Sequence, residues 1–172
     1  DVIPAGKAAT GYITTNFHSV GRDVPVIEEI FDVVYGAMQG NISASRVGSV
    51  YYNRGVASAI IMTEAIRTAH AQFGAAPIGG EEMQWAMEHL DITAERIAEL
   101  GATGLAPPLK LSCADHEGGG WVMFQQWDGD KWVRIGDPIE PMHELTSAMI
   151  KEGAAKYAEE KGITPRDCSK ES

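Results

Sequence analysis

Two short polar segments hold side chains that could bind or act on a ligand. The first places two phenols, an amide and a guanidinium together at Tyr51, Tyr52, Asn53 and Arg54. These residues open a long apolar run, where the free N–H groups at the start of a helix favour an anion. A carboxylate would find both charge and hydrogen bonds there. An equally open alternative is that the tyrosines belong to the core and Arg54 pairs with one of the many carboxylates.

The second segment, Asp115, His116 and Glu117, precedes three glycines at 118–120. A metal site or a phosphate-binding loop is conceivable. However, there is no GK[ST] motif, no GxGxxG before a helix, and no second His or Cys at ligand spacing nearby. We therefore interpret the segment as a polar, glycine-rich turn, and keep a metalloenzyme built on these three residues as a distant alternative.

The rest of the sequence gives no argument for catalysis. The other histidines, His18, His70, His89 and His143, are scattered over separate predicted elements without an HExxH pattern. No GxSxG nucleophile motif is present, and no pair of catalytic carboxylates stands out among 24 acidic residues. We predict a protein that is not an enzyme and that requires no cofactor and no metal.

Composition narrows the class of partner. The 172 residues are 44% hydrophobic and 22% charged, which is typical of one globular domain. A net charge of −10 repels phosphate backbones and anionic lipid, so we expect no nucleic-acid partner. No stretch approaches the roughly 20 apolar residues of a membrane span, and we expect a soluble protein without direct membrane insertion. The start at Asp1 suggests a processed or cut end.

The elements that must position the first segment can be predicted from local patterns. Residues 11–16 alternate and are rich in β-branched and aromatic types, as in a strand, so Asn16, Phe17 and His18 would form its exit. Pro25 opens an amphipathic helix that continues to Met38. Residues 52–73 form a helix whose apolar residues cover most of its circumference, so we expect it to be buried on most sides.

Further elements follow in the second half. We predict a helix at 81–90, a short helix at 94–100 capped by Thr93, and a strand at 109–113. Residues 121–127 and 131–135 form a β-hairpin with its turn at 128–130, and Pro138 marks its exit. A helix at 145–161 precedes a polar tail. Cys113 and Cys168 form either a disulfide or two free thiols, and the residues alone leave both open.

Six ordered motifs resemble one protein family. They are DVIPAG at 1–6, GYITT at 11–15, YYNRG at 51–55, PPLKLSCADHEGGG at 107–120, QQWDG at 125–129 and GITPRDC at 162–168. Together they resemble the C-terminal part of a type I periplasmic solute-binding protein of ABC transporters, in the branched-chain amino acid (Leu/Ile/Val-binding) group.

The resemblance implies an α/β fold of two Rossmann-like lobes, of which 1–172 would be the C-terminal portion, ending in a hairpin. Residues 11–106 would belong mainly to the first lobe, and 107–172 to the hairpin, the return to the second lobe and the tail. The N-terminal half, absent here, would complete both lobes. The implied setting is periplasmic or extracytoplasmic, which favours the Cys113–Cys168 disulfide.

The resemblance also implies a function without chemistry. Such a protein captures a small solute between its lobes, closes by a hinge motion, and delivers the solute to an ABC transporter permease. By position, the ligand-binding residues would be Asn16, Phe17, His18, Tyr51, Tyr52, Asn53 and Arg54, with the solute an amino acid or aromatic carboxylate. The alternative is a ligand-sensing receptor domain of the same fold that acts in signalling.

Overall fold

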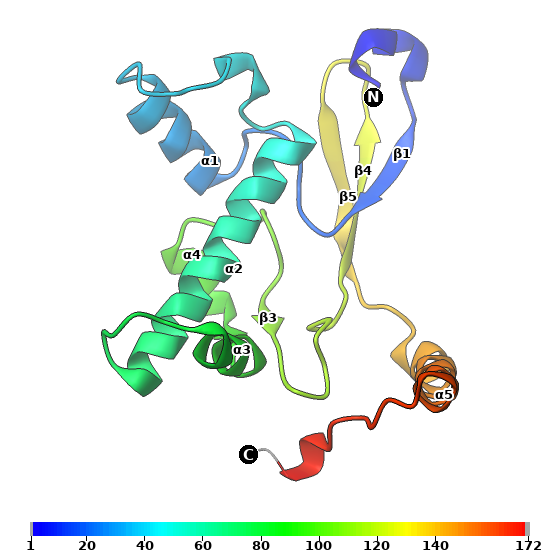
Figure 1. Ribbon diagram of the computed structural model, residues 1–172. Helices are drawn as coiled ribbons and strands as arrows, with labels where there is room; N and C mark the ends of the chain where they lie inside the picture. Colours follow the sequence, from blue (N-terminus) through cyan, green and yellow to red (C-terminus); the bar gives the residue numbers. More distant parts are fainter. Residues whose placement is uncertain (1, 171–172) are drawn as a thin grey trace.

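The structure is a computed structural model that describes residues 2–170, and it has a mixed α/β fold with two small sheets. The helical segments are η1 (Ile3–Ala9), α1 (Pro25–Ile30), η2 (Phe31–Tyr35), η3 (Ala44–Arg46), α2 (Val50–Phe73), α3 (Gly80–Glu88), α4 (Ala94–Glu99), α5 (His143–Lys161) and η4 (Cys168–Lys170). The strands are β1 (Ile13–Asn16), β2 (Asp91–Ile92), β3 (Leu109–Lys110), β4 (Val122–Trp127) and β5 (Trp132–Ile139). Helices α1 to α4 form one body, the longer strands stand beside it, and α5 lies apart from both (Figure 1).

The larger sheet has the strand order β1-β4-β5 and is antiparallel throughout. Every second residue of β4, Met123, Gln125 and Trp127, is buried, as expected for a strand with one face against a core. The predicted turn is confirmed: the Asp128 carboxylate accepts hydrogen bonds from the N–H groups of Asp130 (2.9 Å) and Lys131 (2.8 Å). These bonds fix the hairpin that brings β5 alongside β4.

Strand β5 continues further than the sequence predicts. It runs through Pro138, which we expected to mark its exit, and ends at Ile139. Since β5 is an edge strand of this sheet, the missing N–H of proline breaks no hydrogen bond with a neighbouring strand. Strand β1 begins at Ile13, two residues later than predicted, although the pairing is extended by the hydrogen bond from Gly11 N–H to the Trp127 carbonyl (2.8 Å).

The core of the helical body lies between α2, α3 and α4. Its fully buried members include Ile27, Ala65, Leu90, Ile92 and Leu105. The predicted start of α4 is confirmed, because the Thr93 hydroxyl accepts from the Arg96 N–H at 3.2 Å.

Two carboxylates also organise this body. Glu82 caps α3 by accepting from the Gly79 N–H at 2.9 Å. Glu64 of α2 accepts from both Nε and Nη2 of Arg96, each at 2.9 Å, and this bidentate pair joins α2 to α4.

Three further predictions differ from the structure. The helix beginning at Pro25 does not continue to Met38; it changes to a π-helical turn after Ile30 and ends at Tyr35, before Met38 adopts a positive φ of 56°. The strand expected at 109–113 is reduced to β3, which pairs with β2. The prediction that α2 is buried on most sides is wrong.

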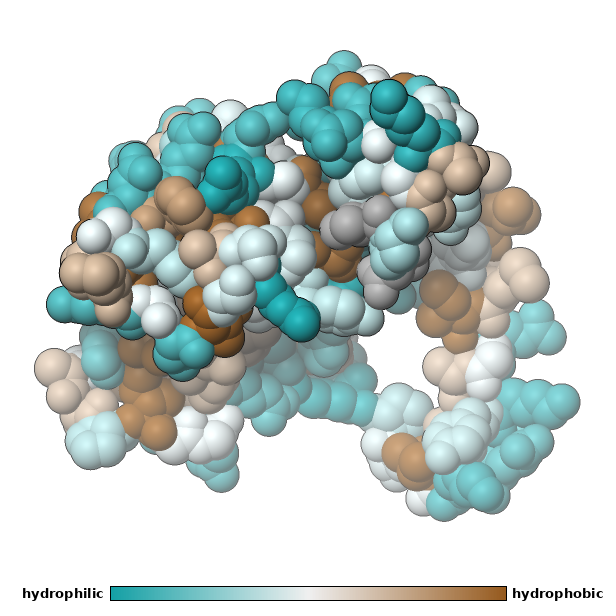
Figure 2. Space-filling model, turned by 90° about the horizontal axis from the view of Figure 1, so that it is seen from above, coloured by the Kyte–Doolittle hydropathy of each residue, from teal (hydrophilic) through white to brown (hydrophobic). Residues whose placement is uncertain are grey.

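In α2 the buried residues are Asn53, Ala57, Ala65 and Ala69, which follow one another at steps of four or eight along one stripe. Small side chains on that stripe allow close packing, whereas Met62 and Phe73 are exposed on the other faces. The local pattern of α2 shows how much apolar surface the helix carries, but not how much of it other segments cover. Apolar side chains therefore reach the outside, as the brown patches of the space-filling view show (Figure 2).

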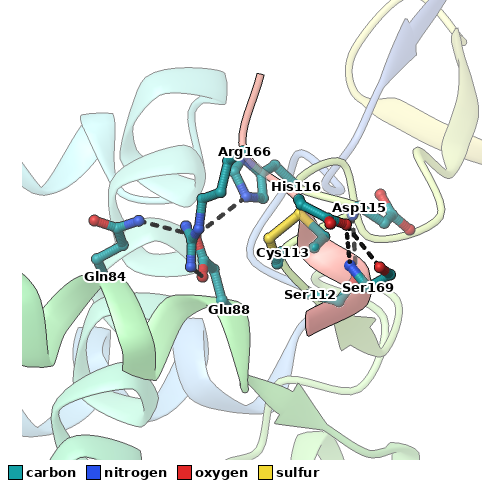
Figure 3. Close-up of a disulfide and its surroundings, with 10 residues drawn as sticks. Gln84, Glu88, Ser112, Cys113, Asp115, His116, Arg166 and Ser169 are labelled. Atoms are coloured by element: carbon teal, nitrogen blue, oxygen red, sulfur yellow. Dashed lines mark hydrogen bonds and ion pairs between the residues drawn. A yellow bond between two sulfur atoms is a disulfide. The ribbon is translucent and has the colours of Figure 1, made fainter. Parts of the chain in front are cut away.

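The C-terminal tail is tied back to the helical body. Cys168 forms a disulfide with Cys113, with the two Cα atoms 5.6 Å apart, which confirms the pairing favoured by the family resemblance. Next to it, Arg166 holds the Glu88 carboxylate of α3 (Figure 3). Between these ties and the sheet, α5 has a single buried residue, Ala158. Within the described residues, no helix is long and apolar enough to cross a membrane.

Candidate functional site

A cavity of about 650 Å³ lies where the exit of β1, the first turns of α2 and the segment 102–122 meet. Asn16, Phe17 and Arg54 supply part of its lining, and the apolar side chains of Ala57, Ile61 and Leu105 supply much of the rest. Of the seven predicted ligand-binding residues, these first three reach the cavity wall. Most of the lining is apolar, and its titratable side chains are those of Arg54, His116 and Glu117.

Arg54 is positioned by neutral groups. Its Nη2 donates to Oδ1 of Asn16 at 3.4 Å, and its Nε donates to Nε2 of His18 at 3.4 Å. The guanidinium also lies over two rings, 5.1 Å from the centre of Phe17 and 5.7 Å from that of Tyr51. Within residues 2–170 no carboxylate lies within 4.0 Å of Arg54. Its charge therefore has no acidic partner in this part of the chain.

His18 lies behind Arg54 and is fully buried. Its Nδ1 is 3.0 Å from the carbonyl oxygen of Ser19, to which it must donate because a carbonyl only accepts. Burial is the main cause that lowers the pKa of His18 below its ordinary value, and the Arg54 charge acts in the same direction, while the bond to Ser19 opposes it. His18 contacts Arg54 and is not among the residues that line the cavity.

Asn53 holds the loop that carries these residues. Its Nδ2 donates to the carbonyl oxygens of Ser19 (3.1 Å) and Gly21 (2.9 Å), and its side chain is fully buried. The start of α2 is closed by Ser49, whose hydroxyl accepts from the Tyr52 N–H at 3.4 Å, so one of the N–H groups expected to face an anion is already used. This geometry gives Asn53 the role of fixing the loop at 19–21 against α2.

The two tyrosines face different surroundings. Tyr51 is 80% exposed and lies beside Arg54 outside the cavity lining, so it can reach a ligand only at the rim. Tyr52 packs against the hydrophobic core, where burial and the nearby Tyr35 raise its pKa. The open alternative for the tyrosines, that they belong to the core, therefore describes Tyr52 but not Tyr51.

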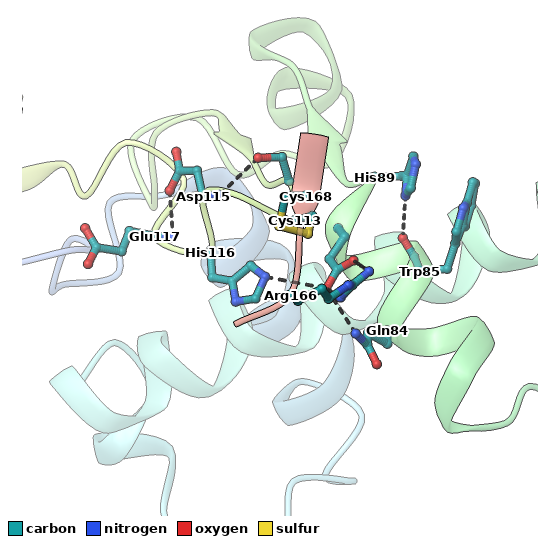
Figure 4. A network of polar contacts seen from close by, with 11 residues as sticks. Gln84, Trp85, His89, Cys113, Asp115, His116, Glu117, Arg166 and Cys168 are labelled. Atoms are coloured by element: carbon teal, nitrogen blue, oxygen red, sulfur yellow. Dashed lines mark hydrogen bonds and ion pairs between the residues drawn. A yellow bond between two sulfur atoms is a disulfide. The ribbon is translucent and has the colours of Figure 1, made fainter. Parts of the chain in front are cut away.

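The segment Asp115, His116 and Glu117 forms the turn that the sequence predicts. Oδ1 of Asp115 accepts from the N–H groups of Glu117 (2.9 Å) and Gly118 (3.0 Å). His116, which also lines the cavity, has its Nε2 3.5 Å from Oε1 of Glu88 and joins the polar network around Arg166 (Figure 4). Among the described residues, no three side chains of metal-binding type gather at one point.

Sequence reasoning missed the lining of the cavity beyond Arg54 and the β1 exit. Glu117, Gly120 and Trp121 reach it from the glycine-rich turn, and Leu105 to Pro108 from the segment before it. A turn next to a tryptophan is a local signal that could have marked this wall. Its closeness to the α2 residues of the cavity wall, which lie about sixty positions away in sequence, is a tertiary property that no local pattern shows.

Comparisons with known proteins identify structures with a similar fold. No protein-family model matches the sequence, and no curated protein does. A solved structure described as an ABC transporter permease from the Pseudomonas fluorescens group is 41% identical, with a TM-score of 0.92, over 98% of this chain and 41% of that protein. A branched chain amino acid ABC transporter from Thermus thermophilus, with bound valine, superposes with a TM-score of 0.62 at 20% identity, over 84% of this chain and 37% of that protein.

The second likeness, at 20% identity, shows a common fold and nothing more. The chain spans less than half of the length of either protein. The fold is therefore one that ABC transporter proteins contain, and the chain corresponds to a part of them.

Proposed function

We propose that this chain belongs to the extracytoplasmic solute-binding component of an ABC transporter and that it helps to capture a small organic carboxylate for uptake. In this proposal the chain is the C-terminal portion of a type I fold with two lobes. Residues 11–106 lie mainly in the first lobe, 107–172 return to the second, and the missing N-terminal half completes both. The protein binds its solute, passes it to the permease and carries out no reaction.

The observation that carries the proposal is the environment of Arg54. Its guanidinium is half-buried at the cavity wall, and the two acceptors that hold it, Asn16 and His18, are neutral. A charge withdrawn from water without a partner is unfavourable, so a site of this kind favours an incoming anion. Two of the five N–H donors of the guanidinium are used by these bonds, and the other three have no hydrogen-bond partner among residues 2–170 and can approach a carboxylate.

The remaining residues of the cavity wall indicate that the rest of the ligand, beyond its carboxylate, is apolar. Ala57, Ile61 and Leu105 present aliphatic surface to the cavity, and Phe17 adds a ring beside the guanidinium. Burying apolar ligand surface against these residues contributes about 25 cal/mol per Å². An aliphatic amino acid or an aromatic acid fits this division into one charged end and one apolar body.

The likeness to ABC transporter proteins, one of them holding valine, supports the same class of ligand. Because the chain spans about two-fifths of those proteins (41% and 37%), further ligand contacts would come from the remaining part. This division explains why apolar faces of α2 and α5 are exposed here, since the missing half would cover them.

Calorimetry on the full-length protein tests the proposal with three carboxylates, valine, leucine and benzoate, and with benzyl alcohol as the uncharged control. Arg54→Ala should lower the affinity for whichever carboxylate the wild-type protein binds by at least about tenfold, or 1.4 kcal/mol. Arg67→Ala is the matched control, because Arg67 lies on the same helix, is exposed and pairs with Glu64. Equal affinity for wild type and the Arg54 variant would remove Arg54 from the site, and no binding of any carboxylate would refute the proposed ligand class.

A further inference from the structure

We propose that His18 is a positioning residue: its unprotonated Nε2 holds the guanidinium of Arg54 in place at the cavity wall, so that ligand affinity falls in mild acid. The inference rests on the proposed function, because it concerns the same anion site. It goes further by assigning a pH-dependent control of that site to a residue that does not touch the ligand.

The tautomer of His18 follows from its two neighbours. Ser19 offers a carbonyl oxygen to Nδ1 at 3.0 Å, so Nδ1 carries a proton. Arg54 offers an Nε–H to the opposite ring atom at 3.4 Å, and arginine stays protonated throughout the physiological range. Nε2 must therefore be the acceptor. A neutral ring with its proton on Nδ1 satisfies both contacts at once.

A protonated ring cannot satisfy both. Its Nε2–H would point at the Nε–H of Arg54, which places two donors and two positive charges 3.4 Å apart. The guanidinium would then keep only its bond to Oδ1 of Asn16, also 3.4 Å long. Repelled from His18 and weakly held, Arg54 would leave the orientation in which it meets a carboxylate.

The surroundings of the ring favour the neutral form at neutral pH. The ring is fully buried, and the edge-on ring of Phe17 lies 4.9 Å from its centre. Within residues 2–170, the charged group that acts on the ring is Arg54 from α2, while Phe17, Ser19 and Asn16 from the β1 exit and the following loop do not titrate. Burial first, and then the charge of Arg54, keeps the pKa of His18 below the ordinary 6.5.

Two variants separate positioning from simple packing. His18→Gln offers Arg54 a carbonyl oxygen that does not titrate, and His18→Leu fills the buried space with no acceptor. Because the pKa of His18 lies below 6.5, we expect wild-type affinity for the bound carboxylate to fall as the pH drops through that pKa, by at least the roughly tenfold loss expected for the Leu variant. The Gln variant should bind within about threefold of wild type at neutral pH and show no such decline, whereas the Leu variant should bind about tenfold more weakly throughout.

The measurements are calorimetric titrations between about pH 5 and 8, and ¹⁵N NMR of the histidine rings without ligand. The inference predicts a His18 ring protonated on Nδ1 and titrating below 6.5. A proton on Nε2, a pKa at or above 6.5, or a Gln variant with the wild-type pH profile would overturn it. If a carboxylate binds through Arg54 but His18→Gln keeps the wild-type dependence of affinity on pH, only this inference fails. If no carboxylate binds, the proposed function fails, and the NMR measurement still decides the protonation state of His18.

Discussion

Arg166 in the C-terminal tail grips Glu88 in α3 with two parallel hydrogen bonds, from Nη1 to Oε1 at 2.7 Å and from Nη2 to Oε2 at 2.8 Å. The carboxylate also accepts from Gln84 at 3.2 Å, and its side chain is 6% exposed. A bidentate pair of this geometry is stronger than a single surface ion pair. Together with the neighbouring disulfide, it holds the tail against the helical body.

This contact predicts an acid-sensitive contribution to stability. The hydrogen bonds from Arg166 are the main cause that lowers the pKa of Glu88 below its ordinary 4.5. The unfolded chain then binds the proton more readily, so the stabilisation is complete above pH 4.5 and declines as pH falls through the folded-state pKa. Glu88→Gln should lower the unfolding midpoint at neutral pH, and the difference from wild type should shrink in acid.

Thermal unfolding followed by circular dichroism from about pH 3 to 7 measures this difference. Glu99→Gln serves as the control, since Glu99 pairs with Arg96 but is 65% exposed. A difference between wild type and Glu88→Gln that stayed constant over the whole pH range would show that the charge of Glu88 is not what matters.

The disulfide predicts a larger effect. Cys113 and Cys168 are 55 residues apart in sequence. A cross-link that closes a loop of that length lowers the entropy of the unfolded chain, which stabilises the fold by about 4 kcal/mol. Replacing both cysteines by serine should shift the urea midpoint down accordingly. Reductant should destabilise the wild-type protein and leave the double variant unchanged; a response of the double variant to reductant would point to a different cause.

Replacing Asn53 should lower the stability of the fold, and not only the affinity for a ligand. Replacing it by alanine removes the donor to a buried carbonyl group at Ser19 and to a partly buried one at Gly21, and should cost about 2 kcal/mol. Thr63→Ala, at an exposed position on the same helix, is the control for helix propensity. Urea unfolding compares the two variants, and a cost below about 0.5 kcal/mol for Asn53→Ala would contradict the role of this amide in fixing the loop.

The two longest helices should differ in local stability. Of the 19 residues of α5 one is buried, Ala158, whereas α2 contributes its whole stripe of small residues to the helical body. Few buried contacts mean a low free energy of local opening. Hydrogen exchange of this isolated chain, followed by mass spectrometry, should show faster exchange in α5 than in α2. In the full-length protein the difference should narrow, because the missing half is proposed to cover α5.

The sequence predicted the elements whose signals are local. The hairpin depends on the Asp128 turn and on alternation in β4, and the start of α4 depends on one hydroxyl, Thr93. Each of these interactions joins residues at most a few positions apart. The family resemblance assigned the strand exit at Asn16 and the helix opening at Arg54 to the same ligand-binding cleft. The two side chains are in contact, and their part in ligand binding stays a prediction.

The interactions that escaped prediction join distant residues. Asn53 bonds to carbonyls 34 and 32 positions away, and Arg166 to a carboxylate 78 positions away. The exposure of α2 was not predicted for a related reason: how much of a helix is buried depends on which distant segments pack around it. Sequence pattern thus identified Arg54 as a candidate anion ligand, but the neutral acceptors that leave it without an acidic partner within residues 2–170 could be found only in three dimensions.

The bond between Cys113 and Cys168 also makes a covalent ring that contains β4, β5 and α5. A protease that cuts the exposed helix α5 would open the ring without releasing either piece. The nicked protein would keep its mass on a non-reducing gel and separate into two fragments only after reduction. A helix with a single buried residue, Ala158, can therefore be cleaved while the tail that follows it stays attached to the helical body.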